Sequence, residues 1–180
     1  IMGDFPRVGL IMATYTEAKP FVERIRWNSS VKEPFPVYYG KKLILAISGI
    51  GKTNAAMACT WLCMTCTPGC VLNIGAAGAN LENLHPGSIH HISEAVETDR
   101  RDFRTNQPFH HQADTIEGFS TLKLATSDRP VTEQEQRRRI AALAELSDME
   151  GAAVIQAAHR FQLRCFVFKF VSDTPKQTSG

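Results

Sequence analysis

The sequence contains no apolar run of the roughly 18 residues that a membrane-spanning helix requires. Its first residues also lack the basic segment, apolar segment and small-residue cleavage site of a secretory signal. Internal repeats and low-complexity segments are absent as well. The 180 residues, 43% hydrophobic and 21% charged, suffice for one core, so we expect a single cytoplasmic domain over residues 1–180.

An excess of charge of one sign is also missing. The chain has 20 basic and 18 acidic residues, well mixed, and its formal charge of +2 creates no field that would attract nucleic acid. The one basic cluster, Arg137 to Arg139, lies among Glu133 and Glu135 on a predicted helix, and we interpret it as a solvated helix face. We therefore expect neither a nucleic-acid partner nor a membrane partner.

The five cysteines are odd in number and do not form the framework of a secreted disulfide-rich domain. Cys59, Cys63 and Cys66 have a spacing that some iron–sulfur enzymes use. They lie, however, in an alanine-, methionine- and leucine-rich run that predicts a buried helix, which favours apolar filler. Histidines are adjacent at 90–91 and at 110–111. Adjacent residues on a strand point to opposite faces, so neither pair is expected to chelate one metal ion. The second pair, in a predicted loop, could do so only if that loop folded to bring both rings together. No metal and no cofactor are expected.

Apolar runs alternate with helical patterns along the chain. An unbroken apolar run at residues 8–13 is typical of a strand buried on both faces. Further strands are predicted at 42–48, 70–74, 88–96, 122–126 and 165–171, and helices at 17–26, 53–66, 133–146 and 151–161. Residues 97–118 are polar with little periodicity and predict a long loop. This alternation indicates the α/β class, with one mainly parallel mixed sheet and helices on both faces.

Acidic residues stand where several of these elements meet. Asp148 and Glu150 precede the helix at 151–161, Asp173 follows the last strand, and Glu17 stands at a strand-to-helix junction. Ligands bind at the carboxyl ends of strands in open α/β sheets, and two carboxylates there can bind hydroxyls and donate a proton. Taken alone, each acid is explained as well by a helix N-cap or a solvated loop residue.

Two glycine-containing segments follow strands. Gly51-Lys52-Thr53 resembles part of a phosphate loop, but the Walker pattern needs a glycine at position 46, where this chain has alanine. We favour a tight turn into a helix whose amides face a ligand. The small residues from Gly75 to Gly78 either bring backbone close to a bound molecule or simply allow close packing of helix and sheet.

In their order and spacing, Glu17, residues 48–53, residues 75–78, Met149-Glu150 and Ser172-Asp173 resemble the purine nucleoside phosphorylase superfamily. The chain looks most similar to the methylthioadenosine/S-adenosylhomocysteine nucleosidases, over nearly its whole length. The resemblance implies a nucleoside phosphorylase-like fold, a nucleoside as the small-molecule partner, and a homodimer. It also implies hydrolysis of a purine nucleoside to the free base and a ribose derivative.

The resemblance assigns the chemistry to Asp173 and Glu17, with Ser172 as a substrate-site residue that orients the acid. Asp173 matches the acid that protonates the purine at N7, and Ser172 matches the residue that orients this acid. Glu17 matches the residue that positions and activates the attacking water. A proton is needed at N7 because departure of the base leaves negative charge on the purine.

The resemblance assigns substrate binding to five further residues. Glu150 matches the carboxylate that binds the ribose hydroxyls, and Met149 its neighbour against the sugar. Ala77 and Gly78 match backbone near the ribose and base, and Val131 matches a position whose backbone reads the base edge. A carboxylate on two sugar hydroxyls fixes the ring while charge develops at its anomeric carbon.

Hydrolysis is favoured over phosphorolysis. The related phosphorylases place an arginine and a serine around the equivalent glycine turn, where this chain has Asn73 and Ala76, and the Glu17 carboxylate would repel phosphate. Two further functions stay open, namely hydrolysis of futalosine and nucleoside binding without catalysis.

The chain departs from the family pattern in three places. Pro130 stands where adenine-specific nucleosidases have an aromatic residue that stacks on the base. Residues 97–118 differ in length and sequence from the family's loop, which meets a neighbouring subunit. The chain ends seven residues after Asp173, where the family continues into a helix, so we expect a C-terminus shorter than the family's.

Overall fold

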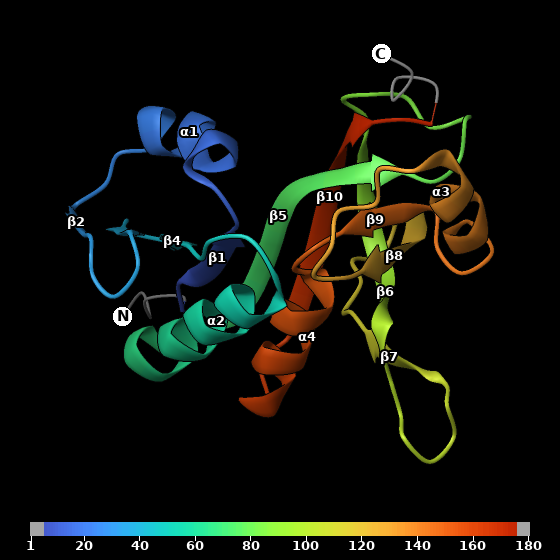
Figure 1. Ribbon diagram of the computed structural model, residues 1–180. Coiled ribbons are helices and arrows are strands. Elements are labelled where there is room, and N and C mark those ends of the chain that lie inside the picture. Colours follow the sequence, from blue (N-terminus) through green and yellow to red (C-terminus); the bar gives the residue numbers. More distant parts are fainter. Residues whose placement is uncertain (1–5, 176–180) are drawn as a thin grey trace.

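The computed structural model describes residues 6–175, and the expectation about the C-terminus lies outside that range. The helices are α1 (Tyr15–Arg24), α2 (Lys52–Cys66), α3 (Gln134–Ile140) and α4 (Gly151–Arg160) (Figure 1). The strands are β1 (Val8–Met12), β2 (Ser29–Val31), β3 (Val37–Tyr39), β4 (Leu43–Ile47), β5 (Cys70–Ala79), β6 (Ile89–Arg101), β7 (Pro108–Gln112), β8 (Thr121–Thr126), β9 (Leu146–Asp148) and β10 (Cys165–Asp173).

The strands form one mixed sheet with a parallel centre. Strands β4, β1, β5 and β10 are parallel neighbours, and Leu10 of β1 stands in register between Leu45 and Leu72. β10 also pairs antiparallel with β6, and β6, β8 and β9 lead back to β5, so this half of the sheet closes into a ring. The predicted α/β class with a mixed sheet is confirmed.

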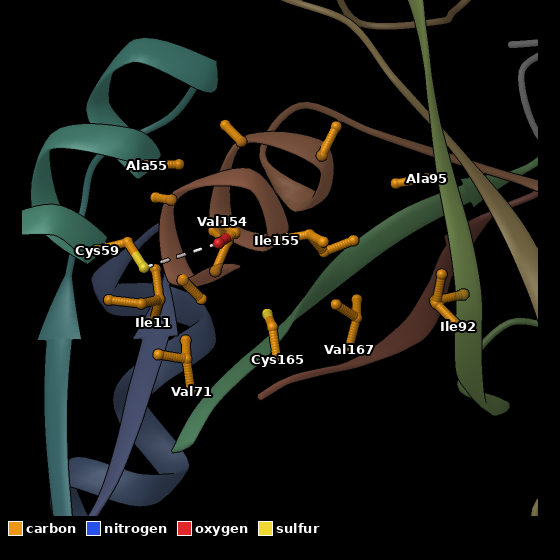
Figure 2. Close-up of a cluster of buried hydrophobic side chains, with 14 of the residues drawn as sticks. Ile11, Ala55, Cys59, Val71, Ile92, Ala95, Val154, Ile155, Cys165 and Val167 are labelled. Atoms are coloured by element: carbon orange, nitrogen blue, oxygen red, sulfur yellow. Dashed lines mark hydrogen bonds between the residues drawn. The ribbon is translucent and has the colours of Figure 1, made fainter. Parts of the chain in front are cut away.

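Helices cover both faces of this sheet because the side chains of its strands alternate. Ile11 of β1 packs in the large core cluster with Cys59 of α2 and Val154 of α4 (Figure 2). Its neighbours Leu10 and Met12 point the other way, into a second cluster that includes a buried residue of α1. The unbroken apolar run of β1 is therefore explained by burial on two sides.

The predicted long loop at residues 97–118 is wrong. β6 continues to Arg101, and β7 returns antiparallel beside it (Figure 1). The strand tolerates polar residues because Glu94 and Glu97 are buried with partners: the carboxylate of Glu97 lies 2.8 Å from Nε2 of His111 and 2.9 Å from Nζ of Lys52. Strand prediction depends on alternating apolar residues. In this part of β6, buried glutamates with charged partners stand at inward positions, so the pattern was not visible.

Two other predicted boundaries are also wrong. The helix expected at 133–146 ends at Ile140, because Leu146–Asp148 instead forms β9, which pairs with both β5 and β8. The strand expected to end at residue 74 continues through Gly75 to Ala79, where the small residues let β5 pair with β9 and β10. None of the helices in residues 6–175 is long and apolar enough to cross a membrane.

Candidate active site

A cavity of about 290 Å³ lies where β1, β5 and β10 end. This is the edge at which ligands bind in open α/β sheets. All eight residues that the sequence pointed to line it: Glu17, Ala77, Gly78, Val131, Met149, Glu150, Ser172 and Asp173.

Hydrogen bonds from two elements hold the Glu17 side chain. Thr14 caps α1 and donates its backbone N–H and its hydroxyl to Oε2 of Glu17, at 2.9 and 3.0 Å. The N–H of Ala76 donates to Oε1 at 2.8 Å. A β-carbon at Gly75 would stand 3.1 Å from the same oxygen, so a side chain there would crowd the carboxylate. A capping box thus fixes a carboxylate against β5 at the cavity wall.

Glu150 is buried at the start of α4, where its Oε1 accepts the N–H of Gly51 at 2.9 Å. Burial raises the pKa of Glu150 to about 7, and the neighbouring Asp148 carboxylate contributes to the rise, against the opposing effects of Lys169 and the Gly51 amide. The side chain lines the cavity, so its carboxyl group is placed to accept hydroxyl groups of a ligand.

A buried ion pair lies next to Glu150. The ammonium of Lys169 on β10 is 2.8 Å from Oδ2 of Asp148, and neither side chain is more than 1% exposed. Asp148 also accepts the hydroxyl of Thr126 at 2.6 Å and the N–H of Gly151 at 2.7 Å. Because each partner of Asp148 is a donor, this buried pair is compensated and holds the cavity floor in place.

Asp173 ends β10 with its side chain 38% exposed. Its Oδ1 accepts the hydroxyl of Ser172 at 2.6 Å, and its Oδ2 accepts a guanidinium N–H of Arg137. A β-carbon at Gly78 would lie 3.4 Å from Oδ1, so the acid sits directly against β5. The Ser172 hydroxyl makes the contact that an orienting serine requires.

Part of the cavity wall is apolar. Val131 and Met149 line it together with Ile50 and Pro130. No aromatic residue of the described range 6–175 lines the cavity. This agrees with proline standing at the position where the resemblance expects a stacking ring.

The interpretation of Arg137 to Arg139 as a solvated face is wrong for Arg137. Its side chain is 3% exposed and lines the cavity, whereas the side chain of Arg139 is 77% exposed. The reason is helical spacing: Arg137 stands three residues before Ile140, which is also buried, so both lie on the inner face of α3.

Lys169 escaped the sequence analysis although a signal was present. It lies on the same face of β10 as Val167 and Val171, two residues away on either side, and all three are buried. A lysine at a core position of an apolar strand indicates a buried partner, because an unpaired buried ammonium is too costly. That partner is Asp148.

The first residue of α2, Lys52, contacts carboxylates. The N–H of Lys52 donates to Asp128 at 2.8 Å, and its ammonium lies 2.9 Å from Glu97 and 2.6 Å from Asp99. Such a surrounding repels phosphate, in agreement with the prediction against a phosphate loop.

Two other features concern possible metal ligands. Cys59, Cys63 and Cys66 lie buried in the apolar core on α2. Within residues 6–175, no group of three or more histidine, cysteine, aspartate or glutamate side chains is placed to hold a metal ion.

Comparison with known proteins identifies the family to which this chain is related. Residues 7–180 match the family model described as the phosphorylase superfamily. The 5′-methylthioadenosine/S-adenosylhomocysteine nucleosidase of Halalkalibacterium halodurans is 30% identical over 161 residues, covering 74% of this chain and 68% of the relative. The enzyme of the same name from Bacillus subtilis is 31% identical over 165 residues, covering 76% and 70%.

Solved structures share the fold. The nucleosidase of the same name from Neisseria meningitidis, in complex with methylthio-immucillin-A, aligns with a TM-score of 0.81 at 25% identity, over 96% of this chain and 88% of that one. A futalosine hydrolase of Helicobacter pylori aligns with a TM-score of 0.82 at 20% identity, over 93% and 84%, which shows the fold alone. The chain therefore belongs to the phosphorylase superfamily and, within it, to the methylthioadenosine/S-adenosylhomocysteine nucleosidase family.

Proposed function

We propose that this chain is a purine nucleosidase that hydrolyses the N-glycosidic bond of methylthioadenosine, adenosylhomocysteine or a closely similar nucleoside. The observation that carries the proposal is that Glu17 lies against Gly75 and Asp173 lies against Gly78, on one cavity. Three residue steps separate these glycines, roughly 10 Å of extended strand. The two acids therefore face the cavity at different points along β5, which suits a substrate bound between them.

The proposed reaction uses the two acids at opposite ends of the bond. Asp173 donates a proton to N7 of the purine, while the electron pair of the C1′–N9 bond leaves with the base. Glu17 accepts a proton from the water whose oxygen bonds to C1′. Glu150 accepts hydrogen bonds from the ribose hydroxyls and holds the ring as positive charge develops on it.

Two contacts support water as the nucleophile. The Ala76 amide, at the position where related phosphorylases have a serine, already donates to the Glu17 carboxylate. The Asn73 side-chain amide donates to the carbonyl of Ile11 at 3.1 Å inside the core. A phosphate ion would meet a negative charge here without a compensating cation from these positions.

The first test is chromatography of free base after incubation with methylthioadenosine, adenosylhomocysteine, adenosine, inosine and futalosine, each with and without phosphate. We expect adenine from the first two substrates without phosphate. Release that requires phosphate would contradict the assigned role of Glu17. Preferential release of hypoxanthine from futalosine would move the chain to that second hydrolase class.

The matching variant is Asp173→Asn. It should lower kcat by about 100-fold or more, because a positioned general acid contributes that much. Binding of a non-hydrolysable nucleoside analogue, measured by calorimetry, should persist. Undiminished base release by this variant would refute Asp173 as the acid.

We also propose that the protein works as a homodimer, as the family resemblance implies. An exposed aromatic residue supports this: Phe103, between β6 and β7, is 88% exposed. Single exposed apolar residues also occur on monomeric proteins, so the family resemblance carries this proposal and Phe103 marks a candidate contact.

A further inference from the structure

We propose that Arg137 is a second positioning residue of the acid beside Ser172, and that its guanidinium stabilises the carboxylate that Asp173 becomes when it gives up its proton. This inference rests on the proposed function. It concerns a residue that neither the motif resemblance nor the composition singled out for chemistry.

The first support is where the guanidinium lies. One terminal nitrogen, Nη1, donates to the carbonyl of Ala79 on β5 at 2.6 Å, and the other, Nη2, donates to Oδ2 of Asp173 on β10. Arg137 itself belongs to α3. One side chain therefore ties three separate elements together at the acid.

The second support is the burial of this contact. The Arg137 side chain is 3% exposed and its Nε has no hydrogen-bond partner within residues 6–175. Leaving a buried donor unpaired costs free energy, so the guanidinium is not placed for the best satisfaction of its own hydrogen bonds. Its placement instead favours the two contacts that it makes with Ala79 and Asp173.

The third support is the space kept for this contact. A β-carbon at Gly78 would lie 3.1 Å from Nη1 of Arg137 and 3.4 Å from Oδ1 of Asp173. A side chain at position 78 would therefore press on both partners. Gly78, whose backbone the family resemblance places near the substrate, also leaves room for the pair.

The chemistry follows from the charge that each state carries. To act as the acid, Asp173 must carry a proton, taken from solvent, when the bond breaks. As the C1′–N9 bond breaks, the O–H bond of Asp173 breaks, an N7–H bond forms, and a carboxylate remains beside the guanidinium. The charge-assisted hydrogen bond is therefore stronger in the transition state than before it, which lowers the barrier. Solvent returns the proton once the base has left.

The test compares two substrates in each variant. Methylthioadenosine needs a proton at N7, whereas its N7-methylated form already carries positive charge on the base and needs none. Arg137→Met removes the charge, Arg137→Lys keeps it at a single point, and Arg138→Met is the matched control, since Arg138 is an exposed residue of the same helix. Spontaneous base loss is subtracted.

We expect Arg137→Met to lower kcat on methylthioadenosine by about 10- to 100-fold with KM changed by less than about 3-fold. On the N7-methylated substrate the loss should be under about 3-fold, Arg137→Lys should be intermediate, and Arg138→Met should match the wild type. The ratio of the two rates within one preparation does not depend on how much of the variant is folded.

Equal losses on both substrates would overturn the inference and make Arg137 purely structural. A raised KM with unchanged kcat would overturn it in favour of a binding contact. A wild-type protein that releases base from neither substrate would overturn the proposed function itself, and with it the assignment of Arg137.

Discussion

At the scale of single residues, the buried carboxyl of Glu150 carries the clearest pH dependence. Its pKa of about 7 in the folded protein exceeds its ordinary value of 4.5. The folded state therefore holds this proton more tightly than the unfolded chain. The stability that Glu150 contributes is complete below pH 4.5 and is lost as the pH rises through about 7.

Glu150→Gln should consequently stabilise the ligand-free protein at pH 8, by up to about 3 kcal/mol, and change it little at pH 4.5. Glutamine keeps the oxygen that accepts the Gly51 amide. Urea unfolding at the two pH values measures the difference. A stabilisation of the same size at both would contradict the assigned titration.

The residues chosen by their resemblance to family motifs lie around the cavity, whereas the charge pattern at Arg137 to Arg139 was interpreted wrongly for Arg137. The eight residues drawn from the motif resemblance all line it, because they belong to strand ends, helix starts and the connection before α3, which converge there. Arg137 was misread since three adjacent arginines beside glutamates are typical of a solvated face. Arg137 differs from its neighbours because its side chain points inward from a short helix. That direction is set by packing in three dimensions.

At the scale of elements, the extension of β6 beyond residue 96 depends on paired charges. Burial opposes ionisation of Glu97, but hydrogen bonds from His111, Lys52 and Arg100 outweigh it and lower its pKa to about 2. The stability from this depressed pKa is present above the unfolded value of 4.5 and is lost as the pH falls through about 2.

Glu97→Gln should therefore destabilise the protein by about 2 kcal/mol at pH 7 and by less at pH 3. Denaturant titration measures both values, and Glu117→Gln, at an exposed position of the chain, is the control. Equal destabilisation at both pH values would mean that the lost contact is not ionic.

The same element shows why parts of the fold escaped prediction. Alternating polarity indicates strands only where one face is apolar, and β6 carries two buried glutamates. β9 has only three residues, and its pairing with β5 and β8 depends on partners far away in sequence. β1 and α2 were predictable because each is a local feature of the sequence: β1 is an unbroken apolar run, and α2 is a long run rich in alanine, methionine and leucine.

At the scale of the whole molecule, the proposed homodimer predicts a mass by light scattering of twice the 20.0 kDa of one chain. Phe103→Ser should weaken association, since it removes a large exposed apolar side chain. Catalysis should follow the dimer fraction if the partner completes the site. A monomer at every concentration tested would contradict the proposal.

The closed ring of β5, β10, β6, β8 and β9 has a consequence for the order in which the molecule opens. Backbone amides of β5 are shared among β1, β10 and β9. Among the strands of residues 6–175, β2 stands at the end of the strand order, pairs only with β3 and is exposed throughout. Local opening therefore costs least at β2 and most at β5. Thermal fluctuations that loosen the rim leave the strand behind Glu17 and Asp173 unchanged, so the two acids keep a common rigid reference.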